Sequence, residues 1–392
     1  MDNLPIYIDN GATSFPKPES VIKAMENAMI QEGGNPGRGS HKLSVKAAQR
    51  VFSVREKIAS LFGSDHPENV VFTKNCTEAL NICINGLIKS GDHFLISDIE
   101  HNSVLRPAHA LTQKGASYSV YKSLAPNFIF EIEKLIRPNT KLIVACHRSN
   151  ILPIELPIYD IAALCKKHGI FLVIDAAQSA GSAVIDMKRL GKCAICAPGH
   201  KGLFGPTGTG FVIFSDDVTT EEIYPLTFGG SGSASAELTM PDVFPEHLEA
   251  GTVNTVGIAG LGAGIDFVKS IGEGYIREYE RELGEYCKHM LMSIPKTAVY
   301  MPNRVSVGTV LFNTANRSCE DVASFLDTKN ICVRSGLHCA FLAHKLNLTQ
   351  NIGAIRASFG IFNTKRDVDA LFFALRSLKI NFQTSHFVAS AP

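Results

Sequence analysis

The feature that most constrains the fold is a regular alternation of short apolar runs with helical patterns. The apolar runs are rich in Val, Ile and Phe and lie at 69–73, 92–97, 141–147, 170–175 and 208–214. Segments with helical spacing between them lie at 76–89, 103–114, 158–168 and 184–190. This rhythm predicts βαβ units around a mostly parallel sheet, in which ligands bind beyond the carboxyl ends of the strands.

A different pattern follows residue 257. Long helical segments there precede strand-like runs near 298–301 and 307–313 and helices at 319–327 and 366–378. At 392 residues the chain exceeds the size at which a single core stops growing. We therefore expect a large domain over 17–256, a small α+β domain from 1–16 and 257–380, and a loose tail at 381–392.

Charge and cysteine content argue against several classes of function. The formal net charge of +1 gives no electrostatic reason to expect a nucleic acid or an anionic membrane as partner. The N-terminal segment has no basic and apolar signal pattern, so we expect a cytoplasmic protein. The ten scattered cysteines then indicate reduced thiols rather than a disulfide framework.

The densest cluster of unusual residues is PGHKGLFGPTGTG at 198–210, directly after the strand-like CAICA. A lysine on a glycine-rich loop at a strand end can lie in a cleft, where desolvation lowers its pKa and makes it a Schiff-base former. Viewed alone, Lys201 would be a surface lysine, but the surrounding glycines favour the reactive role.

Two further segments carry polar residues at strand ends. Asp175 ends an apolar strand, where a carboxylate needs a positive partner. A protonated pyridine nitrogen would supply that partner, and the alternative is a helix cap. In 70–84 a strand, a polar turn and a helix follow one another, so helical N–H groups and the Thr77 hydroxyl would suit a phosphate. An ordinary capped helix is the alternative there.

Two motifs resemble sites of other kinds. Cys193 and Cys196 form a CxxC without a second ligand pair, so we assign them to the strand and expect no metal site. GLGAG at 261–265 lies within a helical pattern rather than after a strand, which argues against a dinucleotide loop.

Ten motifs in order give the chain a family resemblance. They are IDNGATSFPKP (8–18), NPGRGSH (35–41), KNCTEALN (74–81), EHNSVLRP (100–107), HRSN (147–150), DAAQSAG (175–181), GHKGLFGPTGTG (199–210), EAGTVNT (249–255), RSGLHCA (334–340) and RASFGIFNT (356–364). The chain resembles the fold-type-I pyridoxal-phosphate enzymes of the class V aminotransferase group. It is most similar to the cysteine desulfurases with a short catalytic loop, including selenocysteine-lyase-like members. The resemblance implies an α/β fold, with a mostly parallel mixed sheet flanked by helices and a smaller α+β C-terminal domain.

The resemblance also implies a role for each matching residue. Around the cofactor ring, Lys201 would bind covalently, Asp175 would pair with the nitrogen, Gln178 would bond the phenolate oxygen and His101 would stack on the face. Around the phosphate would lie Cys76, Thr77 and His200, with Thr252 from a second subunit. A structural or capping role is the alternative for His101.

The substrate groups follow from the same resemblance. Asn150 and Arg356 would bind the substrate carboxylate, a task that suits a bidentate guanidinium. Cys339 would accept sulfur in an exposed turn, where Arg334 or His338 would favour its thiolate. The alternatives are a structural ion pair for Arg356 and a buried hydrophobic role for Cys339.

The implied activity converts L-cysteine to L-alanine and leaves a persulfide on Cys339. The implied assembly is a homodimer with a shared site, from which a small acceptor protein collects the sulfur. Three alternatives stay open: a selenocysteine lyase, a class V aminotransferase or β-eliminating lyase with Cys339 idle, and a cofactor-binding scaffold without turnover.

Three positions depart from the family pattern. Pro198 stands where a serine is common near the phosphate, Gly11 replaces an alanine, and Pro153 replaces a glycine after HRSN. The sequence therefore leaves the phosphate contacts and the choice between cysteine and selenocysteine open.

Overall fold

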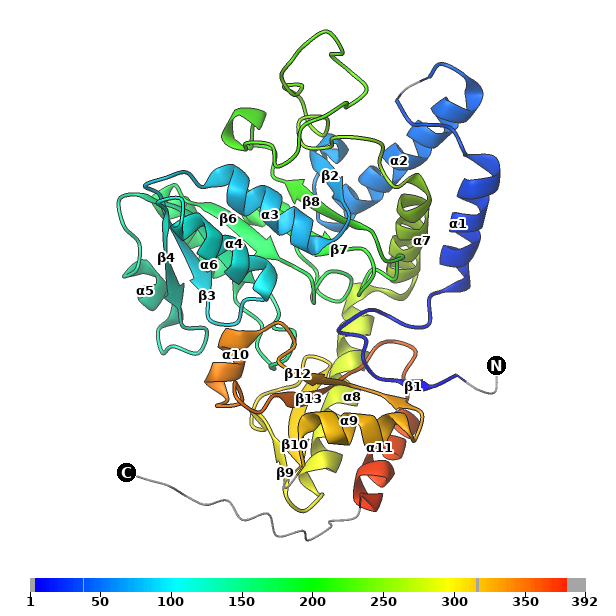
Figure 1. Ribbon diagram of the computed structural model, residues 1–392, viewed down its shortest axis with the longest axis vertical. Coiled ribbons are helices and arrows are strands. Elements are labelled where there is room, and N and C mark those ends of the chain that lie inside the picture. Colours follow the sequence, from blue (N-terminus) through cyan, green and yellow to red (C-terminus); the bar gives the residue numbers. More distant parts are fainter. Residues whose placement is uncertain (1–3, 38, 315–316, 379–392) are drawn as a thin grey trace.

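The computed structural model describes residues 4–37, 39–314 and 317–378, and a seven-stranded sheet forms the centre of its larger part (Figure 1). The strands are β2 (Val70–Thr73), β3 (His93–Ser97), β4 (Ser117–Tyr121), β5 (Thr140–Cys146), β6 (Phe171–Asp175), β7 (Cys193–Pro198) and β8 (Gly210–Phe214). Their order is β2-β8-β7-β6-β5-β3-β4, and β8 runs antiparallel to both of its neighbours. This confirms the predicted mostly parallel mixed sheet.

Helices cover both faces of this sheet because alternate strand residues point to opposite sides. In β3, Leu95 belongs to one hydrophobic core, while Phe94 and Ile96 belong to another. Helices α2 (Lys42–Leu61), α6 (Ile158–His168) and α7 (Thr255–Ile271) pack on the first face, and α3 (Cys76–Leu87) and α4 (Asn102–Thr112) pack on the second. The outer elements of this part are α1 (Glu19–Gln31), which packs on α7, and α5 (Phe128–Glu133).

A second sheet, built mainly from the C-terminal third, lies below the first in Figure 1. It is antiparallel, in the order β12 (Arg334–Gly336), β13 (Ala354–Ser358), β10 (Thr309–Thr314) and β9 (Thr297–Val299). The N-terminal strand β1 (Ile6–Tyr7) reaches this part by pairing with β11 (Ile331–Cys332). The helices here are α8 (Glu273–Met292), α9 (Cys319–Asp327), α10 (Phe341–Leu346) and α11 (Lys365–Ser377).

The helix predicted at 184–190 is wrong. Only a 3-10 turn forms there, over Met187–Arg189. The Asp186 side chain accepts a hydrogen bond from Lys188 N, and Met187 N donates to the carbonyl of Phe62 at the end of α2. These contacts satisfy the backbone groups that a longer helix would have used.

The predicted domain boundaries stay predictions. Ile258, Leu261 and Ile265 of α7, just beyond the boundary at 256/257, pack in the core beside the large sheet. The loose tail predicted at 381–392 lies outside the described residues.

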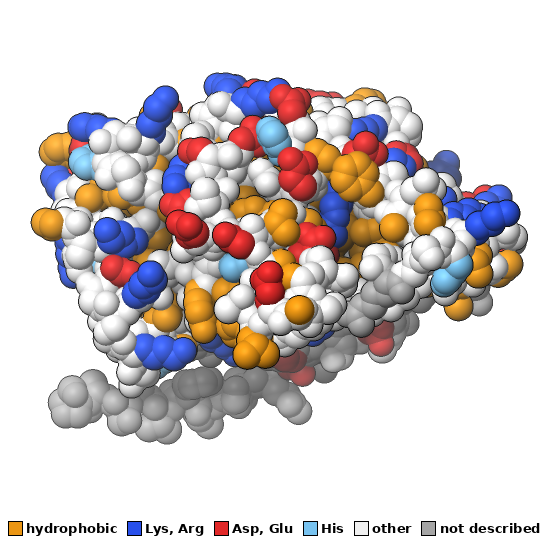
Figure 2. All heavy atoms as spheres, turned by 90° about the horizontal axis from the view of Figure 1, so that it is seen from above, with side chains coloured by type: hydrophobic (Ala, Val, Ile, Leu, Met, Phe, Trp, Pro, Cys, Tyr) orange, Lys and Arg blue, Asp and Glu red, His pale blue; other side chains and the backbone are white. Residues whose placement is uncertain are grey.

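The surface carries charges of both signs. Figure 2 shows basic and acidic side chains interspersed with hydrophobic ones over the face seen from above. Within the part of the chain that the structure describes, no helix is both long enough and apolar enough to cross a lipid bilayer.

A buried ion pair fixes the segment 248–254 against the large sheet. The Arg55 guanidinium binds the Glu249 carboxylate with two hydrogen bonds of 2.8 and 2.7 Å, and both side chains are less than a tenth exposed. Glu249 also accepts a hydrogen bond from Phe72 N in β2. The pair therefore joins α2, the edge of the sheet and the EAGTVNT segment.

We expect Glu249→Ala to lower the free energy of unfolding by about 3–5 kcal/mol, because it leaves the Arg55 charge buried and unpaired. Asp65→Ala removes the exposed ion pair with Lys188 and should lower the free energy of unfolding far less, because water screens this pair. Urea-induced unfolding of both variants measures the difference. Equal losses would contradict the structural role of the buried pair.

Candidate active site

Lys201 lies in the glycine-rich loop between β7 and β8. Burial lowers the pKa of its amine, and the nearby Asp175 carboxylate opposes this shift. The loop packs closely on the turn after β6, since a Cβ atom on Gly181 would lie 2.2 Å from the carbonyl oxygen of Gly202. Gly181 also has a φ of 89°, so both glycines are required to bring Lys201 beside the end of β6.

Asp175 is the last residue of β6, in the centre of the sheet. It is paired with Cys146 of β5 on one side and Cys196 of β7 on the other. Its Oδ1 atom accepts hydrogen bonds from Ala177 N at 2.9 Å and from Cys76 Sγ at 3.6 Å. The side chain is buried, yet it takes part in none of the ion pairs among the described residues. This arrangement suits a carboxylate that receives a positive partner from a bound molecule.

The N-terminus of α3 faces the same space. Asn75 caps this helix by accepting a hydrogen bond from Glu78 N, and Cys76 and Thr77 form its first turn. His200 lines the same cavity, and burial lowers its pKa to about 4. Among the residues that the structure describes, its Nδ1 atom has no hydrogen-bond partner. The free helical N–H groups and this unpaired ring nitrogen suit an anionic group.

The side chain of His101 combines the two roles that the sequence left open. Its Nδ1 atom accepts a hydrogen bond of 3.1 Å from Ser103 N and so caps α4. The same ring lines the space beside Lys201. Burial lowers its pKa, so the ring is biased toward the neutral form.

These groups surround one cavity of about 190 Å³. It is lined by Asn75, Cys76, Thr77, His101, Ser103, Cys146, Arg148, Asn150, Asp175, Ala177, Gln178, Pro198, His200 and Lys201. For comparison, an engineered cavity of about 150 Å³ takes up benzene. The cavity therefore has room for one six-membered ring.

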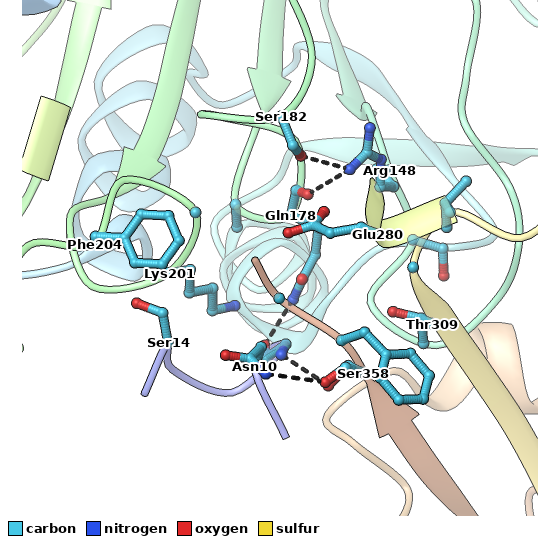
Figure 3. Close-up of a pocket in the computed structure, with 18 residues that line it drawn as sticks. Asn10, Ser14, Arg148, Gln178, Ser182, Lys201, Phe204, Glu280, Thr309 and Ser358 are labelled. Atoms are coloured by element: carbon cyan, nitrogen blue, oxygen red, sulfur yellow. Dashed lines mark hydrogen bonds between the residues drawn. The ribbon is translucent and has the colours of Figure 1, made fainter. Parts of the chain in front are cut away.

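A smaller cavity of about 40 Å³ adjoins Lys201 (Figure 3). Gln178 lines both cavities, and its Nε2 atom donates one hydrogen bond, of 2.9 Å, to the carbonyl of Gly11. An amide nitrogen carries two hydrogens, so this bond uses one of them and leaves the second for another acceptor.

Arg356 lies on β13, directly opposite Arg334 of β12. Its Nη2 atom is 2.5 Å from Asp9, and its Nη1 atom donates to the carbonyl of Asn150. Its buried Nε atom has no hydrogen-bond partner within the described parts of the chain. The structure thus includes the ion pair that the sequence left as the alternative for Arg356. Gly11 accommodates this arrangement, because a Cβ atom there would lie 3.1 Å from Arg356 Cζ.

Cys339 lies half-buried in a turn after β12. Its carbonyl accepts a hydrogen bond of 2.8 Å from Asn102 N, which places it next to His101 at the start of α4. The side-chain amide of Asn150 donates to the carbonyl of the preceding residue, His338, also at 2.8 Å. Asn150 and Cys339 are therefore brought together with the cavity-lining residues.

Thr252 alone among the predicted cofactor residues lies elsewhere. It lines a separate cavity of about 450 Å³, together with Lys74, which precedes α3, and Glu78 in its first turn. Its hydroxyl accepts a hydrogen bond of 3.3 Å from Asn35 in the NPGRGSH loop. Its predicted role, which requires a second subunit, stays a prediction.

Several residues beside the cavity were not assigned from the sequence. Cys146, Arg148 and Ser103 line it. Cys146 ends β5, while Arg148 and Ser103 lie in the HRSN and EHNSVLRP motifs that follow β5 and β3, so positions at or after strand ends were the available signal. Glu100 lies beneath His101, where its Oε1 atom accepts from Ser97 Oγ at 2.7 Å and from Cys146 N at 2.8 Å. It thereby joins the ends of β3 and β5.

Burial raises the pKa of Glu100 to about 8, with the charge of Asp175 adding to the shift. The folded protein therefore holds a proton that the unfolded chain releases, and stability falls as the pH rises from about 5 to 8. Glu100→Gln imitates the neutral acid, so its stability should change less over this range. Urea unfolding of the wild type and of Glu100→Gln at pH 5, 6.5 and 8 tests this expectation. The same change in the free energy of unfolding with pH in both proteins would contradict it.

Comparisons with known proteins agree with this geometry. The aminotransferase class-V family model matches residues 6–371. A probable cysteine desulfurase from Methanothermobacter thermautotrophicus is 35% identical over 93% of this chain and 92% of its own length. A cysteine desulfurase from Salmonella agona is 34% identical over 96% and 94% of the two chains. The apo structure of a cysteine desulfurase from Thermococcus onnurineus is 32% identical, with a TM-score of 0.86 over 95% and 94%. The chain thus belongs to the class-V aminotransferase family and, within it, to the cysteine desulfurases.

Proposed function

We propose that this protein is a pyridoxal-phosphate-dependent enzyme that converts L-cysteine to L-alanine and transfers the sulfur to Cys339 as a persulfide. One observation carries the proposal. The Lys201 amine, the unpaired Asp175 carboxylate and the N-terminus of α3 line a single cavity, and the turn that carries Cys339 is hydrogen-bonded beside it.

The residues of the cavity fit the cofactor. Lys201 would bind it covalently, Asp175 would pair with its ring nitrogen, and the second hydrogen of the Gln178 amide would reach its ring oxygen. His101 would lie on its face, and Cys76, Thr77 and His200 would surround its phosphate. When bound, pyridoxal phosphate supplies an electron sink that stabilises negative charge at the substrate Cα.

Other steps of the reaction would be carried out by side chains of the protein. The lowered pKa of Lys201 increases the share of free amine that can take the Cα proton of the substrate. Arg356 would bind the substrate carboxylate with its unpartnered Nε and with the Nη2 now directed at Asp9. Asn150 lies between this group and the Cys339 turn, since its carbonyl contacts Arg356 and its amide contacts His338.

Sulfur transfer follows as a substitution at sulfur. The Cys339 thiolate forms an S–S bond to the substrate sulfur while the bond between that sulfur and the substrate Cβ breaks. The electron pair of the broken bond stays with the carbon fragment, which takes up a proton and leaves as alanine. Cys339 keeps the transferred sulfur until a second thiol removes it.

We also propose a homodimer in which Thr252 completes the phosphate site of the partner subunit, a small sulfur-acceptor protein, and a cytoplasmic location. The support for the dimer is the separation of Thr252 from the cavity of its own chain. The half-exposed setting of Cys339 supports access for an acceptor.

Replacing the acceptor thiol tests the reaction. We expect Cys339→Ala to lower the rate of alanine formation from L-cysteine by a factor on the order of 10³ or more, as when a nucleophile is removed. Cys332→Ala is the matched control, because Cys332 is the other half-buried cysteine. Turnover that persists in Cys339→Ala would favour an aminotransferase or a β-eliminating lyase, and turnover of L-selenocysteine alone would favour a selenocysteine lyase.

The covalent link has its own test. Borohydride reduction of the holoenzyme should leave the cofactor mass on the peptide that contains Lys201, as measured by mass spectrometry. Lys201→Ala should lose this adduct and the visible absorbance of the bound cofactor, whereas the exposed Lys46→Ala should keep both. An adduct on another lysine would overturn the assignment.

A further inference from the structure

We propose that His344 and Thr349 are positioning residues, which hold the Cys339 turn in place through a chain of hydrogen bonds to His338. This inference rests on the proposed role of Cys339. Neither His344 nor Thr349 lies in the motifs that carry the family resemblance, and neither lines the cavity beside Lys201.

The turn that carries Cys339 has an unfavourable backbone. His338 and Cys339 both have left-handed conformations, with φ angles of 51° and 55°, although each carries a Cβ atom. Such a conformation persists only where its surroundings hold it. The backbone of the turn is held by Asn150, which donates to the His338 carbonyl, and by Asn102 N, which donates to the Cys339 carbonyl.

The side chain of His338 stabilises the turn through further hydrogen bonds. Its Nε2 atom lies 3.2 Å from the carbonyl oxygen of Arg334, and its Nδ1 atom lies 3.2 Å from His344 Nε2. His344 Nδ1 lies 2.7 Å from Thr349 Oγ1. The two rings are nearly parallel, with 8° between their planes, and all three side chains are buried.

The Arg334 carbonyl, at one end of this chain of hydrogen bonds, determines which atom donates and which accepts in each of them. Because the Arg334 carbonyl can only accept, His338 must donate from Nε2, and burial lowers the pKa of this histidine to about 3, so its Nδ1 is an acceptor. His344 therefore donates from Nε2, and its Nδ1 accepts the proton of the Thr349 hydroxyl. The Thr349 hydroxyl lies 2.7 Å from this Nδ1 atom and 3.2 Å from the His344 carbonyl, which is a second and more distant acceptor for its proton. Removing the hydroxyl leaves His344 Nδ1 without its donor.

These hydrogen bonds join the turn that carries Cys339 to the following helix and to the segment just beyond its end. Helix α10 begins two residues after Cys339, His344 lies within it, and Thr349 N donates to the His344 carbonyl just beyond its end. Leu337 and Phe341, on either side of the turn, are about two-fifths exposed, so little packing covers it from outside. The hydrogen bonds from His338 to Thr349 therefore support the turn from its buried side, together with the Asn150 side chain, and their loss should displace the Cys339 sulfur relative to the cavity.

Two matched pairs of variants test this inference in the holoenzyme. Thr349→Val and His344→Phe remove a hydrogen-bonding group at nearly constant shape, whereas Thr349→Ser and His344→Gln retain one. We expect the first variant of each pair to lower kcat for alanine formation by about 10- to 100-fold, because small displacements of a reacting group have effects of this size. The KM for L-cysteine should change less than about twofold, and the second variant of each pair should stay near the wild type.

Two further readouts separate positioning from general damage. The rate at which iodoacetamide alkylates Cys339, followed by mass spectrometry of its peptide, should change in Thr349→Val and His344→Phe. The visible spectrum of the bound cofactor should stay as in the wild type. An unchanged alkylation rate with normal kcat would overturn the inference, and so would loss of the cofactor spectrum, which would mean a general structural role. The alkylation rate can be measured without turnover. It therefore still tests positioning if the Cys339→Ala variant keeps its activity and the proposed function is wrong.

Discussion

The buried carboxylate of Asp175 is the constraint on which the rest of the site depends. It lies at the centre of the carboxyl edge of the large sheet, between the ends of β5 and β7, and has no ion pair among the described residues. A charge in this position is tolerated only with hydrogen bonds and a bound positive partner. The hydrogen bonds come from Ala177 and Cys76, and Lys201 lines the same cavity. The sheet therefore creates a place for a ring that carries a positive nitrogen.

The second sheet adds the groups that a substrate would meet. Hydrogen bonds connect the segments beside the second sheet with those that follow β3 and β5 of the large sheet. They join Arg356 to Asn150, Asn150 to His338 and Asn102 to Cys339. The carboxylate-binding group and the sulfur acceptor thus have fixed positions relative to the cavity. A shift of one sheet against the other would change the distance from Arg356 to the cavity and the distance from Cys339 to the cavity together. This links substrate binding to sulfur transfer.

The positions that follow strands could be predicted from the sequence because local pattern determines them. The apolar runs located the strands of the large sheet except the edge strand β4, whose residues are mostly only half-buried and form no apolar run. Glycine motifs located Lys201 and the turn after Asp175. The 3-10 turn at 187–189 and the chain from His338 to Thr349 could not be predicted in this way. They depend on contacts between segments, such as Met187 with Phe62, or on the orientation of side chains in a turn. The placement of Thr252 depends on a partner subunit, and its role stays a prediction.

The most direct test of the account is the protonation state of the cofactor nitrogen. Holoenzyme reconstituted with pyridoxal phosphate labelled with ¹⁵N in the ring can be compared with an Asp175→Asn variant by ¹⁵N nuclear magnetic resonance. The account predicts the chemical shift of a protonated pyridine in the wild type and of an unprotonated one in the variant. An unprotonated nitrogen in the wild type, or the same shift in both proteins, would contradict the role assigned to Asp175.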